Sequence, residues 1–177
     1  MHINVTIESG VHNIKITDVT PLKTVIGQGY SMNINVTVVN KGDFTETFNV
    51  TLYANTTEIE TKTTTLQSGE TATLTFTWNT YGFTKGNYTI WTYAWPVQGE
   101  KDIEDNTLTD GTAYVSIRGD INGDNTVNYL DGILLGAAFG SKPSDPNWNP
   151  NADINNDKVV NYLDAIILGA NFGQTDP

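Results

Sequence analysis

The chain has 177 residues, a formal net charge of −11 and no cysteine. This length suffices for one large domain or two small ones, and an acidic chain without a basic patch is a poor ligand for nucleic acid or anionic membranes. No stretch reaches the roughly 18 apolar residues of a membrane-spanning helix, and disulfides and thiol chemistry are excluded. We therefore expect no nucleic-acid partner and no membrane insertion.

Residues 1–117 alternate apolar and polar side chains with the period of two that indicates β-strands. Turn signals such as Ser68-Gly69 separate the runs, and no helical period appears before Tyr129. The predicted strands are Ile3–Glu8, Ile14–Val19 with a break from Pro21 to Val25, Ser31–Val39, Phe44–Ala54, Glu58–Leu66, Thr71–Trp78, Gly86–Trp95 and Thr109–Ile117. This spacing predicts an antiparallel β-sandwich of the immunoglobulin type.

The predicted strand Gly86–Trp95 carries three aromatic residues at alternate positions, Trp91, Tyr93 and Trp95. Alternate residues share one face of a strand, so these rings lie together and Ile90 lies on the opposite face. We expect the aromatic face to be the core of the sandwich. Alternatively, an exposed row of flat rings would stack on polysaccharide or on a protein partner.

Acidic residues gather in the segment 100–110, which precedes the last predicted strand. A solvated, charged loop is the favoured interpretation of this composition. A third cation site in the segment is the alternative.

Five Asn-x-Thr sequons lie in the predicted sandwich, and none lies in the C-terminal third. They are Asn4, Asn35, Asn49, Asn55 and Asn87. Asn35 and Asn49 fall at outward positions of their strands, where glycans would be accommodated. Chance is the alternative, since Asn and Thr are abundant, but the distribution favours a surface glycoprotein.

Two twelve-residue segments in the C-terminal third repeat one pattern of oxygen-bearing side chains. Both carry Asp or Asn at positions 1, 3, 5, 9 and 12, the ligand spacing of a calcium loop, in which the position-7 carbonyl adds another oxygen. The predicted ligands are Asp120, Asn122, Asp124, Thr126, Asn128 and Asp131, then Asp153, Asn155, Asp157, Val159, Asn161 and Asp164. We predict two bound Ca²⁺ ions. The alternative, a pair of solvated Asx-turn loops, does not explain why the pattern is duplicated.

The same apolar helical sequence follows each loop, so the repeating unit is a loop and then a helix, without the entering helix of an EF-hand. The repeats cover residues 119–140 and 152–173, and we expect Trp148 in the Pro-rich linker to fold back onto the small core. Position 6 of each loop favours a positive φ, which Asn125 tolerates better than Lys158, so the second site should be weaker.

The helical period predicts one apolar stripe on each helix, and we expect the two stripes to pack against each other. The stripes consist of Leu130, Ile133, Leu134 and Ala137, and of Leu163, Ile166, Ile167 and Ala170. The apolar residues off the stripes are Tyr129, Leu135, Tyr162 and Leu168. We expect these residues to form a surface that the sandwich or a partner covers.

The two repeats, each Asp-x-Asn-x-Asp-x-x-x-Asn-x-x-Asp before an apolar helix, resemble a type I dockerin module over Gly119–Gly173. The resemblance implies a calcium-binding module that docks to a cohesin-like partner. In dockerins, loop positions 10 and 11 help to recognise the cohesin. Those positions are Tyr129 and Leu130 in the first loop and Tyr162 and Leu163 in the second, whereas dockerins often have small hydroxyl residues there. The resemblance therefore does not extend to the usual cohesin specificities.

The sandwich also resembles a known family, the CARDB-like adhesion-related domains of prokaryotic surface proteins, over about residues 11–117. The similar segments are IKITDV at 14–19, VTVVNKG at 36–42, LQSGETATL at 66–74, GNYTI at 86–90 and EDN at 104–106. The resemblance implies adhesion or scaffolding and not catalysis.

Taken together, the sequence predicts an all-β immunoglobulin-like sandwich over residues 1–117 and a small α dockerin-like module over residues 118–177. No Ser/His/Asp motif or phosphate-binding glycine loop occurs, so we do not expect an enzyme. The leading hypothesis is a calcium-stabilised interaction and adhesion module, outside the cell or at its surface, that docks to a cohesin-like partner. One alternative is a subunit of an extracellular fibre or surface layer, whose partner is another copy. A second is a carbohydrate-binding accessory module.

Overall fold

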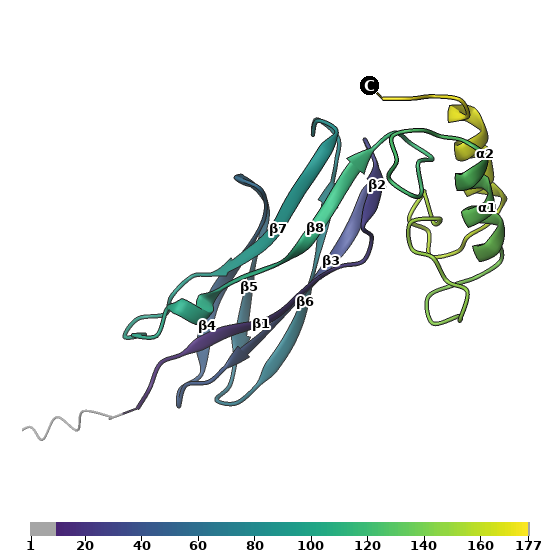
Figure 1. Ribbon diagram of the computed structural model, residues 1–177. Helices are drawn as coiled ribbons and strands as arrows, with labels where there is room; N and C mark the ends of the chain where they lie inside the picture. The colour runs from purple at the N-terminus through teal and green to yellow at the C-terminus, as the bar shows by residue number, and fades with distance from the viewer. Residues whose placement is uncertain (1–9, 177) are drawn as a thin grey trace, which may run out of the picture.

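The computed structural model describes residues 10–176, which form a long β-sandwich with a smaller helical module at one end (Figure 1). The predicted strand Ile3–Glu8 and the sequon at Asn4 lie outside the described residues. The strands are β1 (Ile14–Pro21), β2 (Val25–Gly27), β3 (Ser31–Asn40), β4 (Glu46–Ala54), β5 (Thr57–Leu66), β6 (Thr71–Asn79), β7 (Gly86–Ala94) and β8 (Thr107–Ser116). They form a three-stranded sheet, β1-β3-β6, and a five-stranded sheet, β2-β8-β7-β4-β5. The predicted immunoglobulin-like sandwich is confirmed.

Alternation of apolar residues places one face of each sheet in a shared core. In β3, every second residue from Met32 to Val38 is fully buried. Trp78 of β6, the largest fully buried side chain, packs edge-on against Phe83 and Tyr88, with ring centroids 5.3 Å apart in each pair. These aromatic groups fill the core near the end that carries the module. The outer faces of the two sheets, which point away from this core, are open to solvent.

The chain changes sheets between β1 and β2. Pro21 is the last residue of β1, and the N–H group of Leu22 makes one further hydrogen bond to Asn33 O of the neighbouring β3, at 3.0 Å. Residues 22–24 cross to the other sheet, where β2 runs parallel to β8. The prediction of a wholly antiparallel sandwich is therefore wrong at this pair. No tight turn joins β2 to β8, so nothing forces them to be antiparallel.

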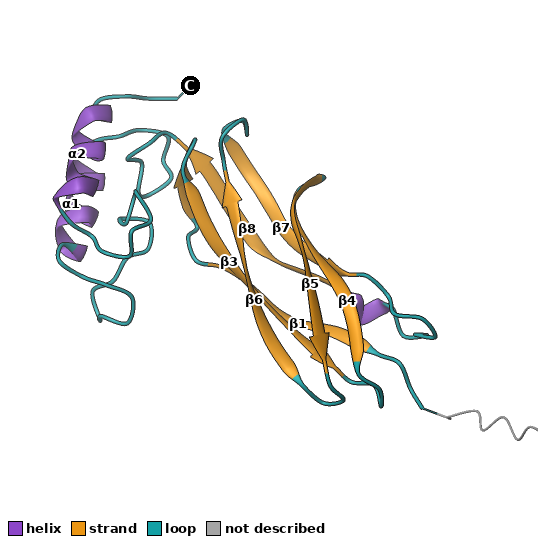
Figure 2. Ribbon diagram, turned by 180° about the vertical axis from the view of Figure 1, so that it is seen from behind, coloured by secondary structure: helices purple, strands orange, loops and turns teal. Residues whose placement is uncertain are grey.

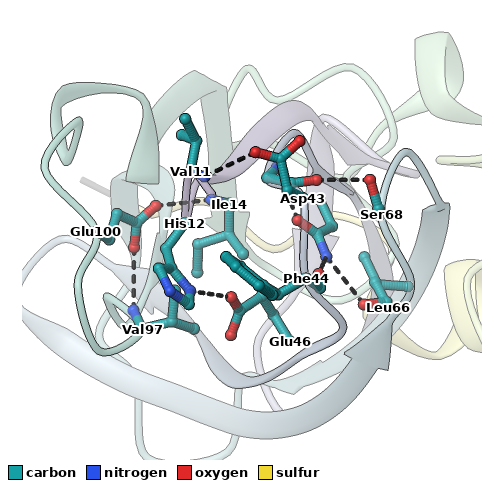
Figure 3. A network of polar contacts seen from close by, with 12 residues as sticks. Val11, His12, Ile14, Asp43, Phe44, Glu46, Leu66, Ser68, Val97 and Glu100 are labelled. Carbon is teal, nitrogen blue, oxygen red and sulfur yellow. Dashed lines mark hydrogen bonds and ion pairs between the residues drawn. The ribbon is translucent and has the colours of Figure 1, made fainter. Parts of the chain in front are cut away.

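Polar contacts close the end of the sandwich opposite the module (Figure 3). Glu100, in the connection between β7 and β8, accepts hydrogen bonds from the N–H groups of Ile14 at 2.7 Å and Val97 at 3.0 Å. His12 Nδ1 lies 2.5 Å from Glu46 Oε1 beside it. The predicted solvated loop at 100–110 is correct only in part. Residues 102 and 104 are exposed, but the 3-10 helix η1 (Glu104–Asn106) follows, Asp105 lies 3.6 Å from Lys15, and β8 already begins at Thr107. Glu100 anchors this segment to β1.

The C-terminal module contains two helices, α1 (Tyr129–Ala138) and α2 (Tyr162–Asn171). We name the segments before them loop 1 (residues 120–131) and loop 2 (residues 153–164). Loop 1 follows β8 and loop 2 follows the linker, which confirms the predicted order of loop and then helix. Asn128 caps α1, and Asp131 at the third helical position completes a capping box; Asn161 and Asp164 do the same for α2. Neither helix is long and apolar enough to cross a membrane, as far as the described residues extend.

The module has a small apolar core of its own. It consists of Ile117, Ile121, Val127, Leu135, Ala138, Ala152, Ile154, Val160 and Leu168. Trp148 is half-buried against this core, as predicted. Because the core is so small, each buried side chain carries a large share of the module's stability.

The helices bury a different face from the one that the helical period predicted. The buried apolar helical residues are Leu135, Ala138 and Leu168, two of which were placed off the stripes. The stripe residues found exposed are Leu130, Ile133, Ala137, Leu163, Ile166 and Ala170. Only Leu134 and Ile167 of the stripes are partly buried. The fully buried carboxylates of Asp131 and Asp164 fix the rotation of each helix, so residues four positions later also face inward.

Each loop is closed by the chain that follows the helix of the other repeat. Val127 of loop 1 accepts a hydrogen bond from Gly173 N at 2.8 Å and donates one to Gln174 O at 2.9 Å. Val160 of loop 2 makes the equivalent bonds with Gly140 and residue 141, at 2.8 Å and 3.0 Å. The repeats are thus related by an approximate twofold arrangement, and neither loop is complete without the other repeat.

The loops attach the module to the sandwich, and the helices lie on the far side of the loops (Figure 2). Asn151 Oδ1 accepts hydrogen bonds from the N–H groups of Thr24 at 3.1 Å and Val25 at 3.3 Å. Arg118 Nε donates to Gln28 O at 2.9 Å. These contacts join the sandwich and the module through both backbone and side-chain atoms.

Apolar and ionic contacts extend this interface. Tyr30 packs against the cores of both domains, and Lys85 Nζ lies 3.0 Å from Asp176 Oδ1. Gly123 of loop 1 has a φ of 78°, and a Cβ atom there would lie 3.0 Å from a methyl group of Val25. Glycine therefore avoids backbone strain at this position and leaves room for the close approach of the sandwich, whereas the equivalent residue of loop 2, Asn156, adopts a similar φ of 63°.

Candidate metal centres

The side chain at position 1 organises the turn of loop 1. Asp120 Oδ1 accepts hydrogen bonds from Gly123 N at 2.7 Å and Asp124 N at 3.3 Å, and its Oδ2 accepts from Asn125 N at 3.0 Å. Ser116, the last residue of β8, donates its hydroxyl group to the same carboxylate. The loop backbone therefore wraps around a nearly buried negative charge that the sandwich also contacts.

The side chain at position 12 closes loop 1. Asp131 Oδ1 accepts from Ile121 N at 2.8 Å and Asn122 N at 3.3 Å, and its Oδ2 accepts from Asn128 N at 2.9 Å. The carboxylate is 0% exposed. It thereby holds the first and last turns of the loop together.

Loop 2 repeats this arrangement. Asp164 accepts from Ile154 N at 2.8 Å and Asn161 N at 2.8 Å. Asp153 accepts from Lys158 N at 3.0 Å and is 1% exposed. The same oxygen-lined geometry has therefore formed twice from the duplicated sequence.

The side chains at positions 3 and 5 are paired with each other in both loops. Asn122 Nδ2 donates to Asp124 Oδ2 at 2.8 Å, and Asn155 Nδ2 donates to Asp157 Oδ2 at 2.9 Å. Within residues 10–176, no three Asp, Glu, His or Cys side chains converge on one point as metal ligands. Each loop instead mixes carboxylates with amide and backbone oxygens, the donor set that a hard cation prefers.

Loop 1 has the electrostatic character of a cation site. Asp120 and Asp131 are at most 4% exposed, and neither forms an ion pair with a basic side chain in the described part of the chain. Buried carboxylates need a compensating charge or several hydrogen bonds. Here backbone N–H groups supply the hydrogen bonds, but no basic side chain among residues 10–176 supplies a charge. The residues of the loop therefore fit an oxygen-coordinated divalent cation.

Loop 2 receives a positive charge from the sandwich. Lys23, in the crossing between β1 and β2, is 4% exposed and donates to the carbonyl oxygen of Asp153. Burial lowers the pKa of Lys23, and the nearby Asp153 partly offsets this effect. Burial likewise raises the pKa of the Asp153 carboxyl group, with Lys23 opposing the shift. Nothing in the sequence marks Lys23 as part of this site, since it lies in the other domain.

Replacing Lys23 by alanine should weaken the attachment of the module to the sandwich and leave both folds intact. The lost hydrogen bond comes from a charged, buried donor, so we expect a cost of about 1–3 kcal/mol at the interface. Small-angle X-ray scattering should show a larger radius of gyration. Replacing the exposed Lys101 by alanine is the matched control. An unchanged scattering curve for the Lys23 variant would contradict the prediction.

The backbone at position 6 has the predicted conformation in both loops. The φ angles are 68° at Asn125 and 70° at Lys158. A lysine in this region is strained by about 1 kcal/mol relative to glycine. Weaker binding at loop 2 remains a prediction, with this strain as its physical reason.

The outer surface of the two helices is apolar. It consists of Tyr129, Leu130, Ile133, Phe139, Tyr162, Leu163, Ile166 and Phe172, which we call the helix face. Tyr129 is 68% exposed and Tyr162 is 65% exposed. The predicted apolar surface therefore exists only in part: Tyr129 and Tyr162 are exposed, so the sandwich does not cover them, whereas Leu135 and Leu168 are buried in the module's own core.

The aromatic row of β7 lies on the outer face of the five-stranded sheet. Ile90 and Ala94 are fully buried, whereas Trp91 and Tyr93 are half-buried and Trp95 is 50% exposed. The expectation that these rings form the core is therefore wrong. Both faces of the strand carry apolar residues, and the face with Tyr88, Ile90 and Ala94 is the one that packs against the sandwich core.

The described sequons lie on the outer surface of the sandwich. Asn49, Asn55 and Asn87 are exposed and Asn35 is half-buried. Asn55 occupies the turn between β4 and β5 with a φ of 52°. Glycosylation at these positions remains a prediction.

Family models match both parts of the chain. A model described as CARDB matches residues 16–114, which is more than half of the chain. The chain belongs to the CARDB family. A model of the dockerin type I domain matches residues 118–172, which contain both loops and both helices. CARDB and dockerin domains are noncatalytic interaction or adhesion domains, and dockerin domains bind calcium. Such domains are typical of extracellular or cell-surface proteins.

Solved structures resemble the CARDB domain. The crystal structure of a CARDB domain from Pyrococcus furiosus, in complex with di-metal ions, has a TM-score of 0.51 and 23% identity, and the match covers 64% of this chain and 99% of that one. A domain from Methanosarcina acetivorans, solved by NMR, has a TM-score of 0.47 and 24% identity, with coverages of 59% and 92%. A β-glucosidase from Erythrobacter marinus has a TM-score of 0.48 and 16% identity over 59% of this chain, and the match spans 15% of that enzyme. Comparison with functionally curated proteins returns no match.

Proposed function

We propose that the chain is an extracellular docking and adhesion module, in which the dockerin domain binds a cohesin-like domain and the CARDB domain acts as a spacer or adhesin. The helix face carries this proposal. It places large apolar side chains on the outer surface of a domain matched as dockerin, where only a partner can cover them. Tyrosine at two equivalent positions is typical of interface hot spots.

We further propose that each loop holds one Ca²⁺ ion. The ligands would be the side chains at positions 1, 3, 5, 9 and 12 and the carbonyl oxygens of Thr126 and Val159. The cation would supply the positive charge that the buried carboxylates lack, and binding to the folded state alone stabilises that state by mass action. Its role is therefore structural, since it holds the helix face in shape.

Light scattering on a sizing column, in EDTA and in millimolar calcium, tests the proposal. We expect a monomer that becomes more compact with calcium and then binds one or more members of a panel of purified cohesin domains. Growth into large species with calcium would instead favour a self-assembling subunit whose partner is another copy. Absence of binding to every cohesin would overturn the cohesin-like partner.

Replacing both Tyr129 and Tyr162 by alanine should abolish or strongly weaken binding to that cohesin. Hot-spot aromatic residues contribute about 2 kcal/mol or more each, so we expect a loss of at least about 30-fold. Isothermal titration calorimetry measures the change. Tyr81→Ala is the control, because Tyr81 is 83% exposed and lies on the sandwich. Binding equal to that of the parent would place the interface elsewhere.

A further inference from the structure

The outer face of the five-stranded sheet carries four aromatic rings that the docking function does not use. Trp91, Tyr93 and Trp95 come from β7 and its end, and Tyr53 comes from the adjacent β4. Tyr53 stacks on Trp91 with ring centroids 4.2 Å apart and an interplanar angle of 9°. Tyr93 contacts Trp95 edge-on at 5.5 Å. The rings therefore form two contacting pairs on the outer face of neighbouring strands.

Hydrogen bonds hold the two indole rings in place. Trp91 Nε1 donates to Asn55 O at 2.7 Å, and Trp95 Nε1 donates to Thr51 Oγ1 at 2.9 Å. The polar edge of each indole is satisfied within the protein, and the half-exposed Trp95 presents ring surface to solvent. A ring fixed in this way loses little conformational entropy when a ligand stacks on it.

Uncharged hydrogen-bonding side chains lie beside the rings. On the outer face of β4 and β5, cross-strand pairs are formed by Thr47 with Thr65 at 2.8 Å, Asn49 with Thr63 at 2.7 Å, and Thr51 with Thr61 at 2.8 Å. A groove of about 430 Å³ lies beside Trp95, and its lining includes Thr47, Asn49, Thr63 and Gln98. Among the described residues, Glu46 is the one charged residue of the lining, and its carboxylate contacts His12. This volume falls in the range of small-ligand sites.

Hydrogen bonds within the protein hold one side of the groove in place. Val97, which also lines it, donates its N–H to Glu100, and Glu100 ties the connection between β7 and β8 to Ile14 of β1 (Figure 3). The contact of His12 with Glu46 fixes the start of β4 on the same side. The residues around Trp95 are thus held by contacts that need no ligand.

We propose that this face binds a neutral polysaccharide, with Trp95 and the adjacent rings stacked on its pyranose rings and the Thr and Asn side chains bonded to its hydroxyl groups. Sugars combine flat C–H faces with many hydroxyl groups, which matches aromatic rings beside uncharged donors and acceptors. A protein interface core would be expected to include aliphatic side chains, but the outward residues of β4 and β7 near the rings are Thr, Asn, Tyr and Trp.

The site lies far from the helix face. β7 begins beside the module, where Lys85 meets Asp176, and ends at the opposite end of the sandwich (Figure 1). A polysaccharide bound at Trp95 would therefore leave the helix face free. The chain would then connect a sugar polymer to a protein partner, a property that goes beyond docking.

Affinity electrophoresis through gels that contain barley β-glucan, xylan, mannan or dextran tests the proposal. The protein should be produced without glycosylation, because a glycan on Asn49 would offer the same sugar chemistry to Trp95 from within the molecule. We expect at least one polymer to retard the parent protein. Trp95→Ala should weaken that binding about tenfold or more, as expected for a stacking aromatic residue.

Two further variants keep the result interpretable. Trp95→Phe retains a ring for stacking and should keep most of the binding, whereas Tyr81→Ala removes an exposed ring outside the face and should bind like the parent. Circular dichroism checks that Trp95→Ala is folded. If no polymer retards the parent, or if Trp95→Ala binds as well as the parent, the proposal is overturned.

Discussion

Replacing Asp131 by asparagine should remove calcium binding at loop 1 and lower the free energy of unfolding of the C-terminal module by about 3 kcal/mol in excess calcium. The carboxylate is fully buried and accepts three backbone hydrogen bonds. An amide group of the same shape would turn an NH₂ group toward at least one of these donors. It would also lose the negative charge that a cation requires at position 12.

Differential scanning calorimetry and calcium titration by isothermal calorimetry measure the two effects. We expect one binding site to remain in the variant, and we expect the module to unfold at a lower temperature. Asp102→Asn is the control, because Asp102 is an exposed carboxylate on the sandwich. Two undiminished calcium sites in the Asp131 variant would rule out the proposed role of position 12. Asp164→Asn should affect loop 2 in the same way.

Replacing Leu168 by alanine should destabilise the module by about 2–4 kcal/mol, whereas Ile166→Ala should change its stability by less than about 0.5 kcal/mol. Both residues lie on α2, but Leu168 is 8% exposed and Ile166 is 61% exposed. Removing a buried side chain leaves a cavity in a core of few residues, and shortening an exposed one does not. The apolar stripe predicted from the sequence gives the opposite order.

Chemical denaturation followed by circular dichroism at the helix wavelengths separates the two variants, since the sandwich contributes little helical signal. Equal stability of the two variants, or a larger loss for Ile166→Ala, would show that the stripe and not the buried face forms the core. The Ile166 variant should instead show its effect in cohesin binding, because Ile166 belongs to the helix face.

The sequence predicted most of the fold because the strands alternate cleanly and the turns are marked by glycine. The predicted strand Thr71–Trp78, for example, differs from β6 by one residue. The two loops of the module were equally clear, because the duplicated spacing determines which backbone groups each Asp or Asn side chain can reach. The family matches agree with both interpretations.

The sequence did not predict which helix face is buried, because both faces are apolar. A signal was nevertheless present: Asp131 and Asp164 must point into their loops as position-12 side chains, and residues four positions later then face inward. The prediction that the aromatic row of β7 is buried was wrong for a similar reason, since Ile90 on one face and Trp91 on the other are both suited to a core. The sequence pattern does not indicate that Lys23 and Asn151 lie at the interface between the sandwich and the module, because their contacts join distant parts of the chain.

The reciprocal closure of the two loops determines the order in which the molecule can assemble. Val127 of loop 1 forms its closing hydrogen bonds with Gly173 and Gln174, which are synthesised a whole repeat later. In contrast, every strand of the sandwich has been synthesised before loop 1 begins. The CARDB domain can therefore fold first and present a finished surface to the emerging dockerin repeats. We therefore expect the two repeats to fold together, because neither loop can make its closing hydrogen bonds before the other repeat is present.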